Sequence, residues 1–306
     1  MKSFKPTSLA FALACLLYGA GVAARVQETQ AQPPSERDER LALILARAGE
    51  GVERYHRGMF RIAFAETHRR EELKEDLTPK KSKEYVYESV ILRQNFSDDS
   101  DDYFARTVSR LKTVDGRPAK KNEVGAAEPV SAHNDFLGFL LPRTQKLYEF
   151  TFEGEDTLDG RRALRVGALR TGQGEPRVEW EGGSFVVFAP TKISFWVDTE
   201  TFDVLRVESH LVREFEFESL HAGGAGPFGR FARPRKISYK REDYAVRFRP
   251  VRFKDPEQTL LLPEYAEWVT VIEGAREPAF RTTISFSNYR RFRSDVKVIE
   301  DTGPNE

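Results

Sequence analysis

The sequence has little cysteine, methionine or tryptophan, and it has no excess of charge of either sign. Its 306 residues include one Cys, two Met and three Trp. A single Cys excludes an internal disulfide and a thiolate zinc site. The 48 Lys and Arg residues are balanced by 48 Asp and Glu residues. This zero net charge argues against a nucleic-acid binder held by a basic surface, and we expect no nucleic-acid partner.

Phenylalanine, in contrast, is abundant, with 23 residues against only two Met. The apolar content of 40% is enough for a folded core, so the chain is not a disordered protein. Many Phe with few Met favour β-sheets over a helical bundle. The composition therefore predicts a β-rich globular protein and says nothing about a ligand.

The first 24 residues have the pattern of a secretory signal peptide. Lys2 and Lys5 provide a positive start, an uncharged apolar run extends from Leu9 to Tyr18, and small residues end the segment at Ala24. The run is shorter than the ~20 residues that a membrane-spanning helix needs. Two alternatives remain open, a retained membrane anchor and a lipoprotein signal with an acylated Cys15.

The rest of the chain divides into three parts. Residues 25–35 are polar and rich in Gln and Pro, which predicts a flexible leader. We expect a single domain over 36–297 and a disordered tail over 298–306. The domain opens with a helix at 36–56, because Ser35 and Asp38 form a capping-box pattern and apolar residues then recur at helical spacing.

After Gly58 the hydrophobic period changes from helical to alternating. About ten or eleven strands follow at hairpin spacing, with no alternation of strands and helices. Tight connections imply antiparallel pairing, and so many strands in one sheet must curl. The predicted fold class is therefore mainly β, a curved antiparallel half-barrel. The charged segment 68–83 is predicted to be a loop, and one long strand is predicted to carry Leu205, Val207, Leu211, Phe215 and Phe217 on one side.

The most apolar window after the signal peptide runs from Phe136 to Leu141 inside a long connection. Asn134 is placed to cap a short helix there, and Pro142 is placed to end it. Apolar residues in a long connection must cover something, so this window is a candidate lid.

Motifs that carry chemistry are weak. Gly224 to Gly229 matches G-x-G-x-x-G, but Pro227 lies inside it and a strand follows instead of a helix. Asp98 to Asp102 begins like a calcium loop but lacks its glycine and its final glutamate. The five His show no metal-ligand spacing. We therefore predict no catalytic residue, no metal and no cofactor; a hydrolase would need His210 or His221 to meet a carboxylate and a hydroxyl group.

Basic residues alternate with aromatic ones between Phe228 and Arg241. Such a stretch can meet anionic lipid headgroups or a partner protein. The alternative is a solvated hairpin base that nearby acidic residues balance.

Four patches of the sequence resemble the periplasmic lipoprotein-carrier (LolA/LolB-like) superfamily. They are the entry from Leu41 through the strand Met59 to Thr67, the turn Gly154 to Ala163, the hairpin Phe195 to Val207, and the closing strand Phe286 to Phe292. The resemblance covers roughly residues 40–297. It implies a half-barrel of about eleven strands whose concave apolar face is covered by the N-terminal helix and a helical lid. Members of this superfamily carry or sense lipid acyl chains.

The leading hypothesis is therefore an exported, periplasmic carrier or sensor that buries lipid or lipoprotein acyl chains without catalysis, with association to the outer membrane as a further option. Burial is favourable by about 0.8 kcal/mol per CH₂ group. The expected lining residues are Phe136, Phe139, Leu140, Phe150, Phe152, Phe195, Leu205, Val207 and Phe215. Ordinary core packing is the alternative for each of them. The alternative function is an envelope scaffold with a filled half-barrel that docks partners or a membrane surface through 228–241.

Overall fold

Antiparallel strands dominate the part of the chain that the computed structural model describes, which is residues 35–95, 103–120, 123, 136–170, 174–181, 184–219, 235–254, 257–274 and 279–292. The predicted signal peptide, the leader up to residue 34 and the tail 298–306 lie outside these residues, and so do Asp98–Asp102 and Gly224–Gly229. The described residues belong to one compact unit, 35–306.

The elements follow one another with a single long helix at the start. The helical elements are α1 (Glu36–Gly58), the 3₁₀ helix η2 (Phe136–Leu140) and α2 (Pro142–Gln145). The strands are β1 (Ile62–Leu73), β2 (Pro79–Asn95), β3 (Tyr103–Val114), β4 (Arg117–Pro118), β5 (Tyr148–Leu158), β6 (Arg161–Arg170), β7 (Arg177–Glu181), β8 (Ser184–Phe188), β9 (Thr191–Asp198), β10 (Val204–Leu211), β11 (Phe215–Ser219), β12 (Arg235–Lys254), β13 (Glu257–Glu273) and β14 (Ala279–Arg291).

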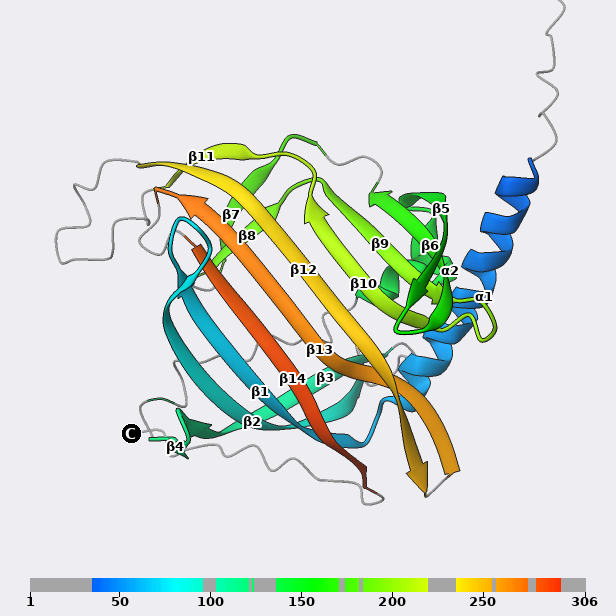
Figure 1. The fold of residues 1–306 in the computed structure, drawn as a ribbon, viewed down its shortest axis with the longest axis horizontal. Helices are drawn as coiled ribbons and strands as arrows, with labels where there is room; N and C mark the ends of the chain where they lie inside the picture. The colour runs from blue at the N-terminus through cyan, green and yellow to red at the C-terminus, as the bar shows by residue number, and fades with distance from the viewer. Residues whose placement is uncertain are drawn as a thin grey trace, which may run out of the picture. The chain divides into compact units, whose positions relative to one another are not determined.

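Twelve strands form one antiparallel sheet in the order β4-β3-β2-β1-β14-β13-β12-β10-β9-β6-β5, and β11 pairs with β12 beside this path. The sheet is strongly bent, with α1 and α2 at the end formed by β5, β6 and β9 (Figure 1). Within the described strands no pairing joins β4 to β5, so the sheet is open. The predicted curved antiparallel half-barrel is confirmed, with β7 and β8 forming a separate two-stranded sheet.

Helix α1 starts where the local sequence predicts. The Ser35 hydroxyl accepts a hydrogen bond from the Asp38 backbone N–H at 3.3 Å, and the Asp38 carboxylate accepts one from the Ser35 N–H at 3.1 Å. This reciprocal pair satisfies N–H groups that a helix start leaves without an intrahelical partner. The helix ends at Gly58, two residues beyond the prediction, and buries Ile44, Ala48 and Val52 on one stripe.

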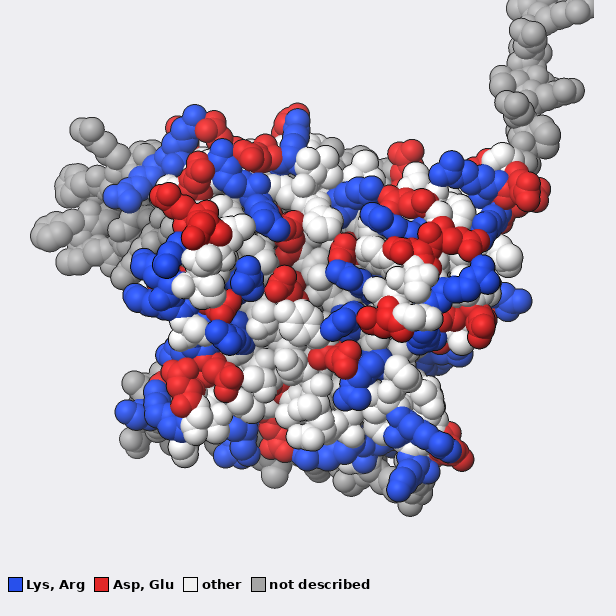
Figure 2. Space-filling model, in the orientation of Figure 1, with Lys and Arg blue, Asp and Glu red and all other residues white. Residues whose placement is uncertain are grey.

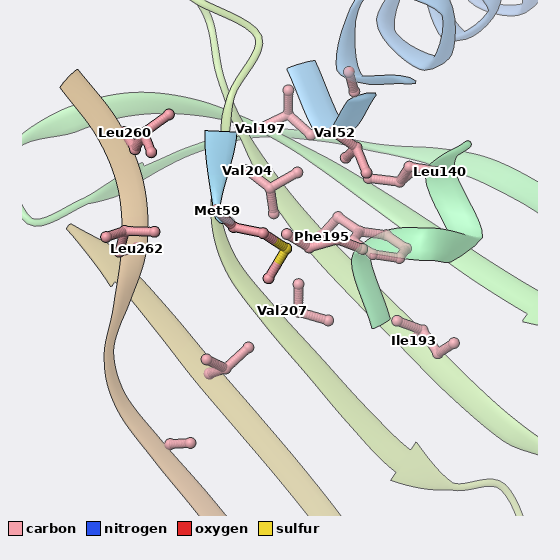
Figure 3. Close-up of a cluster of buried hydrophobic side chains, with 14 of the residues drawn as sticks. Val52, Met59, Leu140, Ile193, Phe195, Val197, Val204, Val207, Leu260 and Leu262 are labelled. Atoms are coloured by element: carbon pink, nitrogen blue, oxygen red, sulfur yellow. The ribbon is translucent and has the colours of Figure 1, made fainter. Parts of the chain in front are cut away.

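The core lies between this stripe and the concave face of the sheet. Side chains from the helical side meet side chains from β9, β10 and β13, among which Phe195, Val207 and Leu262 are fully buried (Figure 3). Burying each aliphatic or phenyl side chain contributes about 1.5–3 kcal/mol relative to exposure. The helix and η2 therefore hold to the sheet mainly through apolar contact.

The predicted loop at 68–83 is wrong, because β1 continues to Leu73 and β2 begins at Pro79. The charged residues here are accommodated as cross-strand pairs. Lys80 contacts Glu72 across the hairpin at 2.6 Å. A strand can carry many charges when they alternate with buried positions and find partners on the next strand.

Two further local predictions are corrected. The long strand predicted to carry Leu205 to Phe217 is two strands, because β10 ends at Leu211 and β11 leaves the path to pair with β12. Pro142 does not simply end the apolar helix. It follows η2 and starts α2, since proline fits the first turn of a helix, where its missing N–H is not needed.

Candidate functional site

Three of the expected lining residues lie inside the main core. Leu140 of η2, Phe195 of β9 and Val207 of β10 are fully buried there. Phe139, Phe150 and Phe152 are partly buried and pack against the same core. The ring of Phe139 lies 4.8 Å from that of Tyr148. Phe136 belongs to η2, but its side chain is outside the described residues.

The other two expected residues lie elsewhere. Leu205 joins a separate cluster with Ala163 and Trp196, which alternate with core residues and so point to the opposite face of the sheet. An irregularity in the register between Val204 and Arg206 places Leu205 on that face too, although Val207 belongs to the core. Phe215 lies on β11, where its ring stacks on Tyr239 at 5.3 Å between ring centroids. The structure thus brings together most of the predicted lining residues but not Leu205 and Phe215.

The concave side also has a cleft of about 190 Å³, between the C-terminal half of α1, η2, the start of β10, the second half of β12 and the start of β13. Its apolar wall includes Val52, Leu137, Val204, Phe248 and Leu260. Its polar rim includes Arg54, Thr201, Asp203, Gln258 and Thr259. An apolar interior with a few polar groups at the mouth is the usual make-up of a ligand pocket.

None of the nine predicted lining residues lines this cleft. Two of its lining residues lie close to them in the chain, since Leu137 belongs to the predicted lid Phe136–Leu141 and Val204 precedes Leu205. The available signal was the glycine content of α1. Glycine lowers helix stability, so Gly49 and Gly51 in an amphipathic helix indicate close approach of something else. A Cβ atom on Gly49 would lie 2.9 Å from the Leu140 carbonyl oxygen, and one on Gly51 would lie 3.4 Å from the Asp203 carboxylate.

The turn between β9 and β10 forms one side of the mouth. The carboxylate of Asp198 accepts backbone hydrogen bonds from Glu200 and Thr201, both at 2.9 Å, and pairs with Arg161 at 2.6 Å. Burial raises the pKa of Asp198, but these hydrogen bonds and the Arg161 charge outweigh it, and the net pKa is lowered. The fixed turn presents Thr201 and Asp203 to the cleft.

The mouth carries an exposed ion pair. Arg54 on α1 lies 3.6 Å from Asp203 on the turn, and their side chains are 55% and 35% exposed. Such pairs contribute about 0–1 kcal/mol, so this contact does not lock the mouth. A firmer attachment lies at the end of the helix, where Arg291 donates to the Gly58 carbonyl and to the Gln258 side chain, both at 2.9 Å.

The cover over the concave face consists of α1, η2 and α2. The Gln145 amide joins two of its parts, because it donates to the Leu45 carbonyl at 3.1 Å and to the Leu140 carbonyl at 2.6 Å. At the other end of α1, Arg37 donates to the Phe152 carbonyl of the edge strand β5 at 2.5 Å. The cover is thus held in part by individual side-chain hydrogen bonds. Helices α1 and η2 take no part in the backbone hydrogen bonds that join the strands of the sheet.

Other candidate chemistry in the sequence finds little support in the described residues. His210 lies 2.8 Å from Asp243 on the sheet surface, and His221 lies outside them. Across the described residues, no three His, Cys, Asp or Glu side chains gather closely enough to hold a metal ion. The helices described here include none that is long and apolar enough to span a membrane.

The basic-aromatic stretch 228–241 is described only from Arg235 onward. There Lys236 pairs with Glu216 at 2.7 Å and Lys240 pairs with Glu214 at 2.9 Å, while Arg241 pairs with Asp243. The face drawn in Figure 2 likewise shows basic and acidic side chains interspersed. In the described part of the stretch, the positive charges are therefore balanced by acidic side chains, and the surface has no excess of positive charge there.

Comparison with known proteins gives remote structural matches only. No family model and no curated protein matches the sequence. Among solved structures, the chain is similar to an outer-membrane lipoprotein-sorting protein domain from Vibrio parahaemolyticus, with 11% identity, a TM-score of 0.36, and coverage of 83% of this chain and 94% of the other. A LolA-superfamily protein from Nitrosomonas europaea shows 10% identity and a TM-score of 0.35, with coverage of 84% and 96%.

A DUF1329-family protein from Desulfovibrio piger shows 12% identity and a TM-score of 0.35, with coverage of 85% of this chain and 95% of the other. LolA-superfamily and lipoprotein-sorting proteins are thus among the structures that this chain resembles, as the sequence patches predict.

Proposed function

We propose that the chain is an exported carrier or sensor that binds lipid or lipoprotein acyl chains between the sheet and its helical cover, and that it is not an enzyme. The observation that supports this most is the apolar-walled cleft of about 190 Å³ that opens between α1, η2 and the sheet. An acyl chain entering the cleft would leave water, and each CH₂ group so buried would contribute about 0.8 kcal/mol.

The size of the cleft limits what it can hold as it stands. An aliphatic cavity of about 150 Å³ accepts a benzene-sized ligand, and pockets for drug-sized ligands begin at about 300 Å³. A cleft of about 190 Å³ therefore fits the end of an acyl chain but not a whole lipid. A longer chain requires η2 and α1 to move away from the sheet, which supports the segment Phe136–Leu141 as the lid.

Residues that fill the core in this arrangement would line the opened cavity. Leu140, Phe195 and Val207 meet where η2 covers β9 and β10, and Phe139 lies at the outer margin of that contact. In this proposal the lid residues exchange contacts with the sheet for contacts with the ligand. The envelope scaffold remains the second candidate, and the observation in its favour is that the core under α1 is filled by the protein's own side chains.

Filling the cleft tests the proposal without disturbing the core. Gly51 lines the cleft, and a Cβ atom there makes only ordinary van der Waals contacts. Gly51→Leu is expected to weaken binding of a fluorescent fatty acid by at least about tenfold, whereas the matched control Gly51→Ala retains it. Equal binding by the wild type and Gly51→Leu would contradict the cleft as the site.

The lid is tested separately with Phe139→Glu, which places a charge on the partly buried margin of η2. We expect loss of fatty-acid binding while circular dichroism still reports a folded sheet. Retained binding in a folded variant would contradict the lid. Native mass spectrometry of the exported chain supplies the ligand class, and a ligand-free mass with no fatty-acid binding would favour the scaffold.

A further inference from the structure

The concave face of the sheet becomes more polar toward the start of β12, where this strand pairs with β11. Val246 of β12 belongs to the apolar core, and Phe248 packs against it. Alternate residues of a strand share a face, so Tyr244 and Glu242 continue the same row. On the neighbouring strand β13, Trp268 lies opposite Tyr244 and Thr270 lies opposite Glu242. A carboxyl group therefore lies among aromatic side chains on the inner face of the sheet.

The aromatic side chains are in contact, and the two tyrosines are buried. Tyr239 and Tyr244 are 4% and 8% exposed. The ring of Tyr244 meets that of Trp268 edge-on, with centroids 6.4 Å apart and an interplanar angle of 90°. Tyr239, placed by a bulge in β12, stacks on Phe215 of β11. The faces of these aromatic rings are electron-rich and can therefore attract a cation.

Among the described residues, the side chains that act on Glu242 include no cation. Burial raises its pKa, the Tyr239 hydroxyl and the Trp268 indole oppose the shift, and the neighbouring Asp243 adds repulsion. None of these groups is positively charged. The indole N–H of Trp268 and the hydroxyl of the 2% exposed Thr270 are also buried without a hydrogen bond of normal geometry. Glu242 is partly buried, and an acid that is partly withdrawn from water without a cation is costly to keep ionised.

The basic residues nearest along the chain have other partners. Lys240 pairs with Glu214 and Glu273, at 2.9 and 3.7 Å. Arg241 pairs with Asp243. Arg70, which faces this row from β1, lies over the Phe280 ring at 5.6 Å. The positive charge that would compensate Glu242 is thus not supplied by these residues.

We propose that Glu242, Tyr239, Tyr244 and Trp268 form a binding site for an ammonium group, carried either by a small amine or by a lipid head group. A single carboxylate enclosed by aromatic rings matches an organic cation, because the carboxylate supplies the charge and the rings supply cation–π contacts. A divalent metal ion fits less well, since it requires several oxygen ligands. This site is independent of the acyl cleft, and either proposal can fail without the other.

The test compares a cation with a neutral molecule of the same shape. Choline chloride and 3,3-dimethylbutan-1-ol are titrated into the full chain, with binding followed by calorimetry and tryptophan fluorescence. We expect choline to bind at least about tenfold more tightly than the neutral alcohol. Absence of saturable choline binding, or equal binding of the two, would overturn the proposal.

A matched pair of acid variants locates the site. Glu242→Gln keeps the size and polarity of the side chain but removes its charge, and is expected to weaken choline binding at least about tenfold. The control Asp243→Asn removes the adjacent acid, which pairs with His210 and Arg241 and repels the charge of Glu242, and is expected not to weaken binding. Equal losses in both variants would contradict the site. If Glu242→Gln does not fold, Trp268→Phe replaces it, with a weaker loss expected.

Two further ligands separate the sources of the ammonium group. Ethanolamine represents the free amine, and dihexanoyl-phosphatidylethanolamine represents the lipid, with dihexanoyl-phosphatidylglycerol, whose head group has no ammonium group, as its control. Binding of ethanolamine supports a small amine, and binding only of the ethanolamine lipid supports a head group. Equal binding of both lipids would contradict recognition of the ammonium group.

Discussion

The two glycines of α1 allow a sharp test of how the helical cover meets the sheet. Both Gly49 and Gly51 lie in the helix interior, where replacing glycine by alanine normally stabilises a helix by about 0.5–1 kcal/mol. At Gly51 the added Cβ atom has its nearest neighbour at 3.4 Å, an ordinary contact, so Gly51→Ala should show this gain in full.

Gly49→Ala should show the opposite sign. Its Cβ atom would lie 2.9 Å from the Leu140 backbone oxygen and 3.3 Å from the Gln145 amide. The first contact is with backbone, which cannot turn away as a side chain can. Overpacking of this kind costs about 1–3 kcal/mol, which offsets the helix gain. We expect Gly49→Ala to be destabilised by up to about 2 kcal/mol, with η2 displaced from α1.

Urea denaturation of both variants, followed by far-ultraviolet circular dichroism, measures these free energies of unfolding. The difference between the variants should be about 1–3 kcal/mol, which is the cost of the close contact itself. Equal stabilisation by both substitutions would refute the reasoning, because it would mean that η2 does not pack on Gly49. A change in the m-value of Gly49→Ala would indicate altered compactness and a displaced cover.

Three other predictions concern buried groups. Leu140→Ala, at a side chain with no exposed surface, should lower the free energy of unfolding in urea by about 2–5 kcal/mol, and a loss below about 1 kcal/mol would contradict the packing of the lid on the core. Asp198→Asn should cost about 1–3 kcal/mol at neutral pH and little at acidic pH, because the lowered pKa of Asp198 gives stability that is present above its unfolded pKa and lost as pH falls through the folded one. For Glu242, whose folded pKa is raised, stability is highest below the unfolded pKa and falls as pH rises through the folded pKa. Glu242→Gln should therefore flatten the pH dependence of the melting temperature, and an unchanged profile would contradict the partial burial of this acid.

The parts of the fold that depend on neighbours in the sequence were predictable. The start of α1 follows from Ser35 and Asp38, three residues apart, whose reciprocal hydrogen bonds are present. The change from helical to alternating periodicity after Gly58 likewise predicts the antiparallel sheet. The apolar segment Phe136–Leu141 was correctly predicted as a short helical element, and its use as a lid remains a proposal.

The errors arose where long-range pairing overrode local composition. Residues 68–83 are too charged to indicate strands by pattern, yet contacts such as Lys80 with Glu72 let them pair. Leu205 was expected beside Val207 in the lining, but a register shift between β9 and β10 places it on the opposite face. A shift of one residue reverses the face of a side chain, and the sequence pattern alone does not reveal it.

The candidate sites depend on tertiary structure more strongly still. The cleft combines Gly51 of α1 with Val204 of β10 and Leu260 of β13, and the acid Glu242 meets Trp268 only through the register of β12 with β13. By itself the sequence determined the elements and the mainly β class, because capping and hydrophobic periodicity act over a few residues. Only the tertiary structure decided which side chains share a face, because curvature, bulges and register are set by contacts between residues far apart in the chain.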